Sequence, residues 1–404
     1  MRASYHRLLY WLCALMLTAS SCADTSSQPE ESPGIEQYPG VKDLYQFVEF
    51  HRAKNRWPAL GVGVIHKGRI VGLGMAGERM IGSGQWAELG DHFEVGSLAK
   101  SMTATVAAMV VEEGKIDWNT RIVDVFPEWQ EVILPAYQEV TLEQLLGHRS
   151  GLDQWMNSNE QFSAWNRRHS KNSALEQRLL FGPAALKRQP RYTPGAEHYY
   201  CNDGYFVAGS MIERVSDSRF EDQVRKRLFE PLKLTSATLG CGSGDHTLTN
   251  VWGHEDGSFG RTIAIKPEVT EFGDPPFGSP GGFLYCSVPD LLKYVNFHIE
   301  GAIGRGLLLK SQSFDRLHTP LKGQNYALGW EVEIKRNSEG KVIERSMYHG
   351  GYTGRTRANM WFCPESQWGT VIVCNHGRGV GEEMSTVFYA LLQEFEKLDH
   401  ASGQ

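Results

Sequence analysis

Two places in the sequence carry a serine followed three residues later by a lysine: Ser97 with Lys100, and Ser338 with Lys341. Residues three apart share one face of a helix, so the lysine side chain can reach the serine hydroxyl. A serine at a helix N-terminus also has free backbone N–H groups beside it, which stabilise an oxyanion as it develops. The spacing therefore points to a serine nucleophile with a lysine as its proton-transfer partner.

Only the first of these pairs has the required surroundings. Gly96 precedes Ser97, and apolar residues then recur at helical spacing as far as Gly114, a residue type that commonly ends helices. Ser338 lies instead in a polar turn between two predicted strands. An isolated S-x-x-K is a short motif, and a helix-capping serine with a solvated lysine is its commoner origin. The interpretation therefore needs further residues to support it.

Two more short motifs follow Ser97 along the chain. Tyr200 and Asn202 form a Y-x-N triplet after a turn signal and just before a predicted helix. His349 and Gly351 form an H-x-G triplet at the edge of a predicted late strand. Each motif alone is weak, but three of them in this order and in these contexts indicate a serine acyl-transfer site.

The sequence around these motifs resembles that of the serine β-lactamase and penicillin-binding-protein superfamily. It is most similar to the class C-like branch, which also contains D-alanyl-D-alanine peptidases, D-aminopeptidases and carboxylesterases. The resemblance covers residues 40–398 and implies a β-lactamase/transpeptidase-like fold. The stretches that carry it are 93–104 (FEVGSLAKSMTA), 145–152 (LLGHRSGL), 200–205 (YCNDGY), 281–287 (GGFLYCS), 326–330 (YALGW) and 349–354 (HGGYTG).

The resemblance implies a role for each motif residue. Ser97 would attack an acyl carbonyl and form an acyl-enzyme, while Lys100 and Tyr200 share the proton transfer, either of them as the base. Asn202 would orient Lys100 or the substrate amide. The backbone N–H groups of Ser97 and Tyr352, the residue after H-x-G, would form the oxyanion hole.

His349, which with Gly351 belongs to the implied substrate-binding edge, departs from the pattern. Class C β-lactamases and D-Ala-D-Ala peptidases usually carry a lysine there, which helps to hold the substrate carboxylate. A histidine, with a reference pKa of about 6.5, is largely neutral at pH 7, although protonation toward pH 6 would restore a cation. The departure favours esterase-like or peptidase-like members, unless Arg355 or Arg357 supplies the charge.

Other residues near the motifs receive structural interpretations. For His148 in the LLGHRSGL stretch, we expect a hydrogen bond to a loop carbonyl rather than catalysis. We interpret Cys201 as a small buried residue. The tryptophan- and histidine-rich stretches 154–169 and 251–272 are expected to line the mouth of the cleft and set specificity.

The predicted elements form an α+β fold. Residues 44–56 have a helical pattern, 60–76 a hairpin pattern, and 382–398 form a closing helix. Strands at both chain ends predict one antiparallel sheet with flanking helices, and a mainly helical subdomain is inserted at about 117–280. Four late strands, joined by turns that include Gly350-Gly351, are expected at 326–335, 341–348, 357–363 and 369–375.

The first residues are typical of an export signal. A short basic segment precedes an apolar run at residues 8–19, which is too short for a bilayer span of ~20 residues. Cys22 follows Ala19-Ser20-Ser21, which resembles the lipobox of bacterial lipoproteins. The sequence therefore predicts a signal peptide at 1–21, a flexible tether at 22–39 and the body at 40–398. It also predicts a periplasmic or cell-envelope location, with possible membrane anchoring through a lipidated Cys22.

Composition excludes several function classes. The chain has 404 residues, a hydrophobic content of 41% and a net charge of −6 without a basic block, which argues against a nucleic-acid partner. It contains no G-x-S-x-G and no H-E-x-x-H, and the G-x-G-x-x-G at 72–77 fits strand glycines better than a dinucleotide site. We expect no metal and no cofactor.

The leading hypothesis is an exported serine hydrolase that acts on a small ester, amide or peptide. The alternatives are a β-lactamase or peptidoglycan D-Ala-D-Ala carboxypeptidase, and an inactive binding homologue. The last is disfavoured because Ser97, Lys100, Tyr200 and Asn202 are all present.

Overall fold

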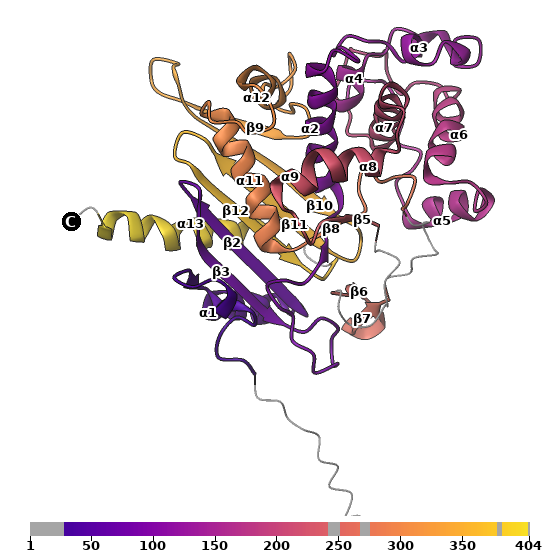
Figure 1. Cartoon of the computed structure of the whole chain (residues 1–404). Helices are drawn as coiled ribbons and strands as arrows, with labels where there is room; N and C mark the ends of the chain where they lie inside the picture. The colour runs from indigo at the N-terminus through magenta and orange to yellow at the C-terminus, as the bar shows by residue number, and fades with distance from the viewer. Residues whose placement is uncertain (1–27, 241–250, 267–274, 378–381, 403–404) are drawn as a thin grey trace, which may run out of the picture. The chain divides into compact units, whose positions relative to one another are not determined.

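The computed structural model describes residues 28–240, 251–266, 275–377 and 382–402 (Figure 1). The predicted signal peptide and Cys22 lie outside the described residues. The folded body, which begins at Glu31, contains a seven-stranded sheet of order β1-β3-β2-β12-β11-β10-β9. Its strands are β1 (Lys42–Asp43), β2 (Ala59–His66), β3 (Arg69–Gly77), β9 (Glu331–Arg336), β10 (Val342–Tyr352), β11 (Arg357–Cys363) and β12 (Trp368–Cys374).

The two ends of the chain meet in the middle of this sheet. β2 pairs with β12 along its length, from Leu60 opposite Cys374 to His66 opposite Trp368. The rings of His66 and Trp368 stack with their centroids 3.8 Å apart. All pairings are antiparallel except that of the short β1 with β3, so the predicted sheet built from both chain ends is confirmed.

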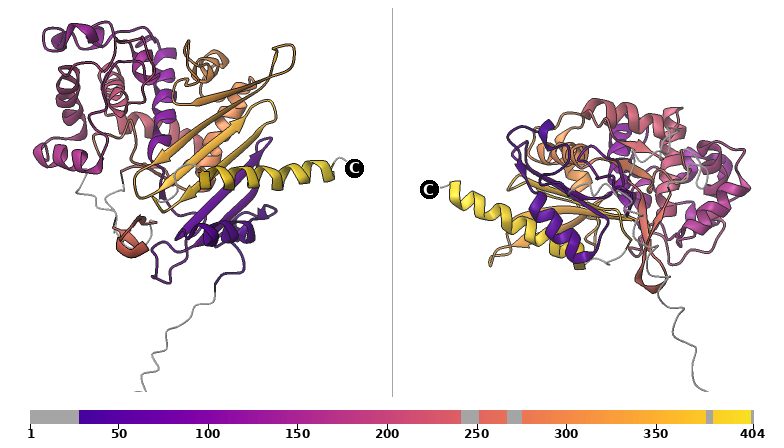
Figure 2. Two further views of the ribbon diagram at one scale, coloured as in Figure 1. Left: turned by 180° about the vertical axis from the view of Figure 1, so that it is seen from behind. Right: turned by 90° about the horizontal axis from the view of Figure 1, so that it is seen from below.

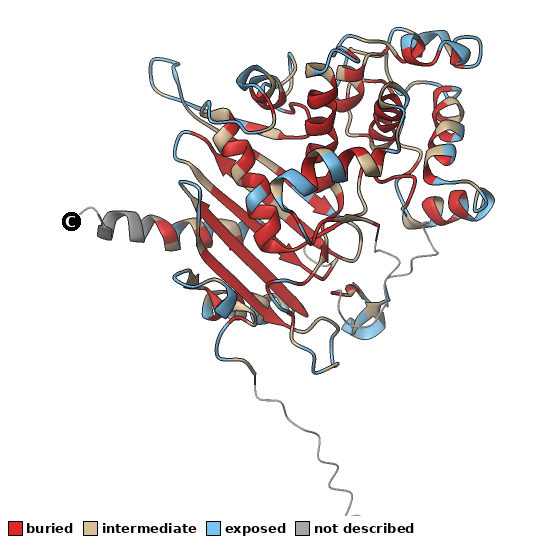
Figure 3. Cartoon of the chain, viewed as in Figure 1, coloured by how far each residue is buried: buried red, intermediate tan, exposed pale blue. Residues whose placement is uncertain are grey.

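Helices cover both faces of the sheet. α1 (Tyr45–Asn55) and α13 (Glu382–Ser402) pack on one face, and α11 (Val288–Ala302) packs on the other (Figure 2). Side chains alternate between the faces of a strand, so Val371 and Val373 face the α11 side while Ile372 faces α1 and α13. Burial on both faces explains why the central strands are apolar at nearly every position (Figure 3).

The G-x-G-x-x-G stretch lies in β3, as the sequence interpretation required. A Cβ atom on Gly74 would lie 2.5 Å from Val48 Cγ2 of α1, which is closer than side chains pack. Glycine therefore allows α1 to lie directly against the strand, and the stretch is a packing feature.

The helical subdomain surrounds α7 (Asn202–Ser216). Arg178 of α6 is fully buried, and its guanidinium lies 2.5 Å from Glu213 of α7 and 2.9 Å from Glu221 of α8. Because a buried charge is costly without partners, this cluster ties the three helices together. The other helices here are α3 (Ile122–Val125), α4 (Leu142–Leu146), α5 (Asn159–Arg168), α6 (Ala174–Leu186), α8 (Phe220–Val224) and α9 (Glu230–Leu232).

Short strands connect the subdomain to the large sheet region. β4 (Phe93–Glu94) and β5 (Thr238–Leu239) both pair with β8 (Leu284–Cys286), and β6 (Gly253–Asp256) pairs with β7 (Thr262–Ile265). The predicted boundary near residue 280 therefore falls just before β8. The remaining helices are α2 (Ala99–Glu112) and α12 (Ser311–His318), and no helix among the described residues is long and apolar enough to cross a membrane.

The structure corrects two of the predicted late turns and strands. Gly350 and Gly351 do not form a turn, because β10 continues through them to Tyr352 and pairs with β11. The turn comes afterwards, where Thr353 N donates to Thr356 O at 3.3 Å. Residues 326–330 form a tight turn instead of a strand, closed by a hydrogen bond from Ala327 N to Trp330 O at 2.7 Å.

The last part of the predicted tether is also folded. Ser32 is buried and donates its hydroxyl to Asp43, and its oxygen accepts a bond from Met75 N at 3.1 Å. Leu89 N donates to Pro33 O at 3.0 Å. Polar, proline-containing composition predicted flexibility here, but the sheet edge and the loop before β4 supply hydrogen-bond partners for this segment.

Candidate active site

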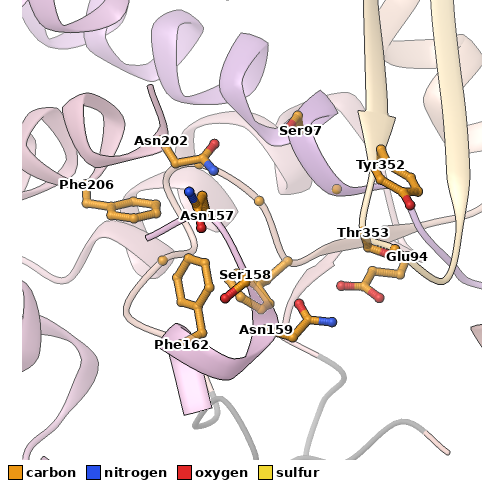
Figure 4. A pocket seen from close by; sticks show the side chains of 16 residues that line it. Glu94, Ser97, Asn157, Ser158, Asn159, Phe162, Asn202, Phe206, Tyr352 and Thr353 are labelled. Atoms are coloured by element: carbon orange, nitrogen blue, oxygen red, sulfur yellow. The ribbon is translucent and has the colours of Figure 1, made fainter. Parts of the chain in front are cut away.

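A cavity of about 280 Å³ opens in front of Ser97, between the helical subdomain and the edge of β10 (Figure 4). Ser97 lies in a 3₁₀ turn, Gly96–Leu98, that leads directly into α2. The predicted helix start at Ser97 is therefore confirmed. The residues lining the cavity are Glu94, Gly96, Ser97, Asn157, Ser158, Asn159, Phe162, Asn202, Phe206, Gly278, Gly281, Gly282, Phe283, Tyr352, Thr353 and Gly354.

The lysine of the S-x-x-K motif lies directly behind the serine. Lys100 Nζ donates a hydrogen bond to Ser97 Oγ at 3.0 Å and another to the Gly281 carbonyl at 2.5 Å. Lys100 is fully buried, and the loss of hydration lowers its pKa to about 7. A substantial fraction of Lys100 is therefore an uncharged amine at neutral pH, and this form can accept a proton.

Tyr200 lies on the same side of the serine. Its ring centroid is 4.9 Å from Lys100 Nζ. Burial raises the pKa of Tyr200, and a hydrogen bond with Ser97 acts in the opposite direction. Tyr200, about a hundred residues further along the chain, thus forms one contiguous group with Ser97 and Lys100.

His148 holds the segment that carries Tyr200. The His148 carbonyl accepts a hydrogen bond from Tyr199 N at 2.9 Å, and its Nδ1 atom accepts one from Cys201 N at 3.1 Å. The expected bond from the His148 ring to a loop carbonyl is therefore wrong, because the ring nitrogen faces a backbone N–H. Its ring centroid lies 4.3 Å from that of Tyr200, so His148 contacts Tyr200 from behind.

Asn202 begins α7 and reaches the loop at the mouth of the cavity. Its amide donates to the Met156 carbonyl at 3.3 Å, so its hydrogen bond goes to this loop rather than to Lys100. The neighbouring Asp203 accepts bonds from Trp155 N at 3.0 Å and Met156 N at 3.1 Å, and burial raises its pKa to about 7. The N-terminus of α7 thereby fixes the loop.

The H-x-G edge of β10 lies against the serine turn. A Cβ atom on Gly351 would lie 2.1 Å from the Val95 carbonyl oxygen and 3.5 Å from Ser97 N, so only glycine fits there. A Cβ atom on Gly96 would lie 3.3 Å from Tyr352 N. The two backbone N–H groups expected to form the oxyanion hole, those of Ser97 and Tyr352, are therefore brought to the same place.

His349 is buried behind this edge and does not behave as a cation. Its Nε2 atom lies 3.0 Å from Tyr326 Oη and its Nδ1 atom 2.8 Å from the Gly350 carbonyl, so Nδ1–H donates and Nε2 accepts. Burial and the charge of Lys100 lower its pKa to about 3. The expectation that His349 gains a charge near pH 6 is therefore wrong, and His349 is absent from the described lining of the cavity.

The two arginines considered as replacements for that charge have other partners. Arg355 pairs with Glu255 at 3.0 Å. Arg357 lies with its guanidinium carbon 4.3 Å from the ring centroid of Tyr352 and donates to the Gly377 carbonyl at 3.1 Å. Neither residue belongs to the described lining of the cavity.

Of the two stretches expected to line the mouth of the cleft, the first contributes residues to the cavity. Residues 157–159 and Phe162, all within the predicted specificity stretch 154–169, line the cavity. In the second stretch, residues 251–266 do not line it, and residues 267–272 lie outside the described residues. The sequence reasoning missed Glu94, the Gly281 carbonyl and Tyr326, although all three lie in the stretches that carried the resemblance.

The serine of the second S-x-x-K motif does not line the cavity. Ser338 lies in the turn between β9 and β10, where Asn337 Oδ1 accepts bonds from Glu339 N and Lys341 N. Within the part of the chain that the structure describes, no three His, Cys, Asp or Glu side chains cluster in a way that could hold a metal ion.

Comparison with known proteins identifies the family. The family model described as Beta-lactamase matches residues 44–393. The chain belongs to the β-lactamase family. It is 26% identical over 214 residues to penicillin-binding protein 4 of Amycolatopsis lactamdurans, a match that covers 52% of this chain and 51% of that protein. The chain thus spans about half the length of this relative.

Solved structures share the fold at low sequence identity. A class C β-lactamase from Rhodobacter sphaeroides superposes with a TM-score of 0.65 and 16% identity, covering 87% of this chain and 98% of that one. A D-amino acid amidase from Ochrobactrum anthropi SV3 superposes with a TM-score of 0.67 and 18% identity, covering 89% and 98%. The predicted α+β, β-lactamase/transpeptidase-like fold is confirmed, and the family and its fold neighbours are hydrolytic serine enzymes.

Proposed function

We propose that this protein is a serine hydrolase that cleaves an ester or amide through an acyl-enzyme on Ser97. The observation that carries the proposal is the hydrogen bond of 3.0 Å between Ser97 Oγ and Nζ of the fully buried Lys100. An uncharged lysine amine beside a serine hydroxyl is a general base next to its nucleophile. The inactive-homologue alternative does not account for a buried lysine kept at this position.

The reaction follows from the arrangement. Ser97 Oγ attacks the substrate carbonyl carbon while its proton passes to Lys100, with Tyr200 beside both groups. The N–H groups of Ser97 and Tyr352 donate to the oxyanion, and each such donor contributes about 2.7–4 kcal/mol in comparable hydrolases. The proton then leaves with the alcohol or amine, and water hydrolyses the acyl-enzyme in the same way.

The proposed substrates are neutral esters and amides ahead of β-lactams and D-alanine peptides, both of which carry a carboxylate. His349 and the two arginines considered for binding a carboxylate are buried or paired. The second candidate, a β-lactamase or D-Ala-D-Ala carboxypeptidase, is favoured by membership of the β-lactamase family.

One panel of substrates separates these candidates. The purified protein is assayed with p-nitrophenyl acetate, nitrocefin and a D-Ala-D-Ala peptide. Intact mass is measured after treatment with a fluorophosphonate. We expect one covalent adduct and the highest kcat/KM on the ester. If nitrocefin is the best substrate, the β-lactamase candidate replaces the esterase. If the protein shows neither an adduct nor turnover, the inactive homologue is the remaining candidate.

We also propose that the protein is exported to the cell envelope and anchored through Cys22. The support is the sequence of residues 1–22, with its basic start, apolar run and lipobox-like ending. Metabolic labelling of the full chain with an alkyne fatty acid in a bacterial host, compared with Cys22→Ala, tests this. Equal labelling of both proteins excludes acylation at Cys22, and recovery of the unprocessed chain from the cytosol excludes export.

A further inference from the structure

The cavity in front of Ser97 has an apolar wall of phenylalanine rings. Phe162 of α5 and Phe206 of α7 lie next to each other in it, with their ring centroids 5.8 Å apart (Figure 4). Phe283 lies on the other side of Phe162, at 5.1 Å, and both pairs meet edge to face, at 73° and 79°. The buried Phe277 contacts Phe162 at 5.5 Å and Phe206 at 5.6 Å. Close packing among these rings gives the wall a fixed shape.

Glycines give the rings their places and leave space in the cavity. A Cβ atom on Gly278 would lie 2.7 Å from Phe162, and one on Gly281 would lie 2.7 Å from Phe206, so neither position has room for a side chain. Gly282 also lines the cavity, but a Cβ atom there would meet nothing nearer than 4.0 Å beyond its chain neighbours. The space beside Gly282 is therefore open.

Polar side chains next to the wall hold the loop before α5. The Asn157 amide donates to the Gln154 carbonyl at 3.4 Å, and Ser158 Oγ accepts from Gln161 N at 3.3 Å. The Asn202 amide donates to the same loop. These hydrogen bonds are made within the protein, so the part of the cavity beside the phenylalanines favours an apolar group.

The positions of the proton-transfer groups indicate which part of a substrate enters the cavity. The leaving group takes its proton from Lys100 or Tyr200, and such a transfer needs a hydrogen-bond distance of ~2.6–3.2 Å. Among the described residues, Ser97 and Tyr352 line the cavity, whereas Lys100 and Tyr200 do not. The leaving group therefore lies toward Lys100 and Tyr200, and the acyl group, which stays on Ser97, extends into the cavity.

We infer that the cavity is an acyl-group site for an apolar group of about one ring, such as a phenylacetyl group. Phe162, Phe206 and Phe283 contact the ring, and the absence of a side chain at Gly282 leaves the space that it occupies. The volume of about 280 Å³ is at the lower end of ligand pockets, ~300–1,000 Å³, which suits one ring better than an extended peptide. This inference rests on the proposed function and adds the acyl group of its substrate.

Three p-nitrophenyl esters test the inference, because they share a leaving group and differ only in the acyl group: acetate, phenylacetate and diphenylacetate. Each kcat/KM is divided by the alkaline hydrolysis rate of the same ester, which removes differences in intrinsic reactivity. We expect the phenylacetate to exceed the acetate by about tenfold to hundredfold, the effect of burying one ring. The diphenylacetate should fall below the phenylacetate, because its second ring has no room.

Substitutions at Gly282 should remove this preference in steps. Gly282→Ala should lower the ratio of phenylacetate to acetate, and Gly282→Leu should bring it to about one, because the added side chain occupies the place of the ring. Gly90→Leu is the matched control. Gly90 is exposed and a Cβ atom there would meet nothing within 4 Å, so this variant should keep the wild-type ratio.

Three results overturn the inference. They are a ratio near one in the wild type, the wild-type ratio in Gly282→Leu, and a diphenylacetate that is better than the phenylacetate. Thermal unfolding shows whether each variant is folded. If Gly282→Leu does not fold, Gly282→Ala decides the test, since it adds a single methyl group in open space.

Failure of the proposed function gives a different result. If no ester is hydrolysed and the fluorophosphonate leaves no adduct, Ser97 is not an active nucleophile. The apolar site is then tested by binding, with Kd values of phenylacetamide and acetamide from ligand-observed NMR titrations. Tighter binding of phenylacetamide that is lost in Gly282→Leu supports the site, and equal binding of the two amides overturns it.

Discussion

The pocket around Ser97 has two regions that differ in burial: a buried region behind the serine, which we call the back, and an exposed region at the cavity mouth, which we call the front. Behind Ser97, Lys100 and Tyr326 are fully buried and His349 is 3% exposed, and each makes hydrogen bonds to its neighbours. At the front, Tyr352 is 57% exposed. Residues 157 and 158 belong to the loop before α5, which Asn202 and Asp203 of α7 hold by hydrogen bonds to residues 155 and 156.

This difference in burial assigns proton transfer to the back of the pocket and substrate selection to the front. At the back, low hydration lowers the pKa of Lys100 and His349, so the proton-transfer groups are set by burial. At the front, the loop and the β4 edge supply side chains that line the cavity. Changes at the back should therefore alter kcat for every substrate, and changes at the front should alter the ranking of substrates.

The largest expected effect is that of Ser97→Ala. Loss of the nucleophile should lower kcat on p-nitrophenyl acetate by about 10⁶-fold, the size of the loss known for the nucleophile of a serine hydrolase. Intact-mass spectrometry should show one fluorophosphonate adduct in the wild type and in Ser338→Ala, and none in Ser97→Ala. An adduct that survives in Ser97→Ala contradicts the assignment of the nucleophile.

Lys100 and Tyr200 test whether the back acts as one unit. Lys100→Ala and Tyr200→Phe should each lower kcat by about 10²–10⁴-fold, the usual range for a lost acid–base group. The double variant should be little worse than the worse single variant, because both residues serve the same proton transfer. Steady-state kinetics of the four proteins gives the coupling, and effects that simply multiply would show two independent groups.

Gly351 tests the contact between back and front. Gly351→Ala would place a Cβ atom 2.1 Å from the Val95 carbonyl oxygen, so β10 must move away from the serine turn. We expect kcat to fall by about 10²-fold, the cost of a displacement of roughly 1 Å at a catalytic group, and stability by about 1–3 kcal/mol.

Gly350→Ala is the matched control for this change. Gly350 is exposed, and a Cβ atom there would meet only Asn359 Oδ1, at 3.3 Å. Thermal unfolding and kcat should both stay close to wild type. Equal effects of the two substitutions would mean that a general disturbance of β10 explains the loss in Gly351→Ala.

The pH profile tests which group at the back titrates. Lys100 is protonated below its pKa of about 7 and then cannot accept the serine proton. On the acid side of this pKa, kcat/KM for a neutral ester should therefore fall by about tenfold per pH unit. His349 stays neutral across this range, since its pKa is lowered to about 3. A midpoint that moves strongly toward acid or disappears in His349→Asn would show that His349 is the titrating group.

Variants of His148 measure how much its hydrogen bond to the segment that carries Tyr200 contributes to kcat and to stability. His148→Leu leaves Cys201 N without its acceptor, at a cost of about 1–3 kcal/mol, and should lower kcat by about threefold to tenfold through a displaced Tyr200. His148→Asn retains an acceptor, and asparagine tolerates the left-handed backbone at φ 57°, so it should recover most of the kcat. Stability that changes without kcat would make His148 a folding residue alone.

Several features of this protein could be predicted from residue type and spacing. The S-x-x-K pair at a helix start, the hairpin at 60–76 and the closing helix depend on local periodicity and turn residues, which are written in neighbouring positions. The union of both chain ends in one sheet also followed, because apolar runs with two-residue periodicity occur only near the ends.

Other features were decided by contacts between distant segments. The sequence shows a histidine at position 349 with an ordinary reference pKa, but burial beside Lys100 and Tyr326 makes it a neutral hydrogen-bonding group. The sequence predicted a turn at Gly350 and Gly351, but the strand continues because β11 pairs with both residues. At position 351 the glycine is required because a Cβ atom would collide with the carbonyl of Val95. The acidic and aromatic sides of the cavity likewise come from residues 94, 162 and 206, which only the tertiary fold brings together. Local patterns encode elements and reactive pairs, whereas hydration, charge balance and pocket shape depend on which elements pack against one another.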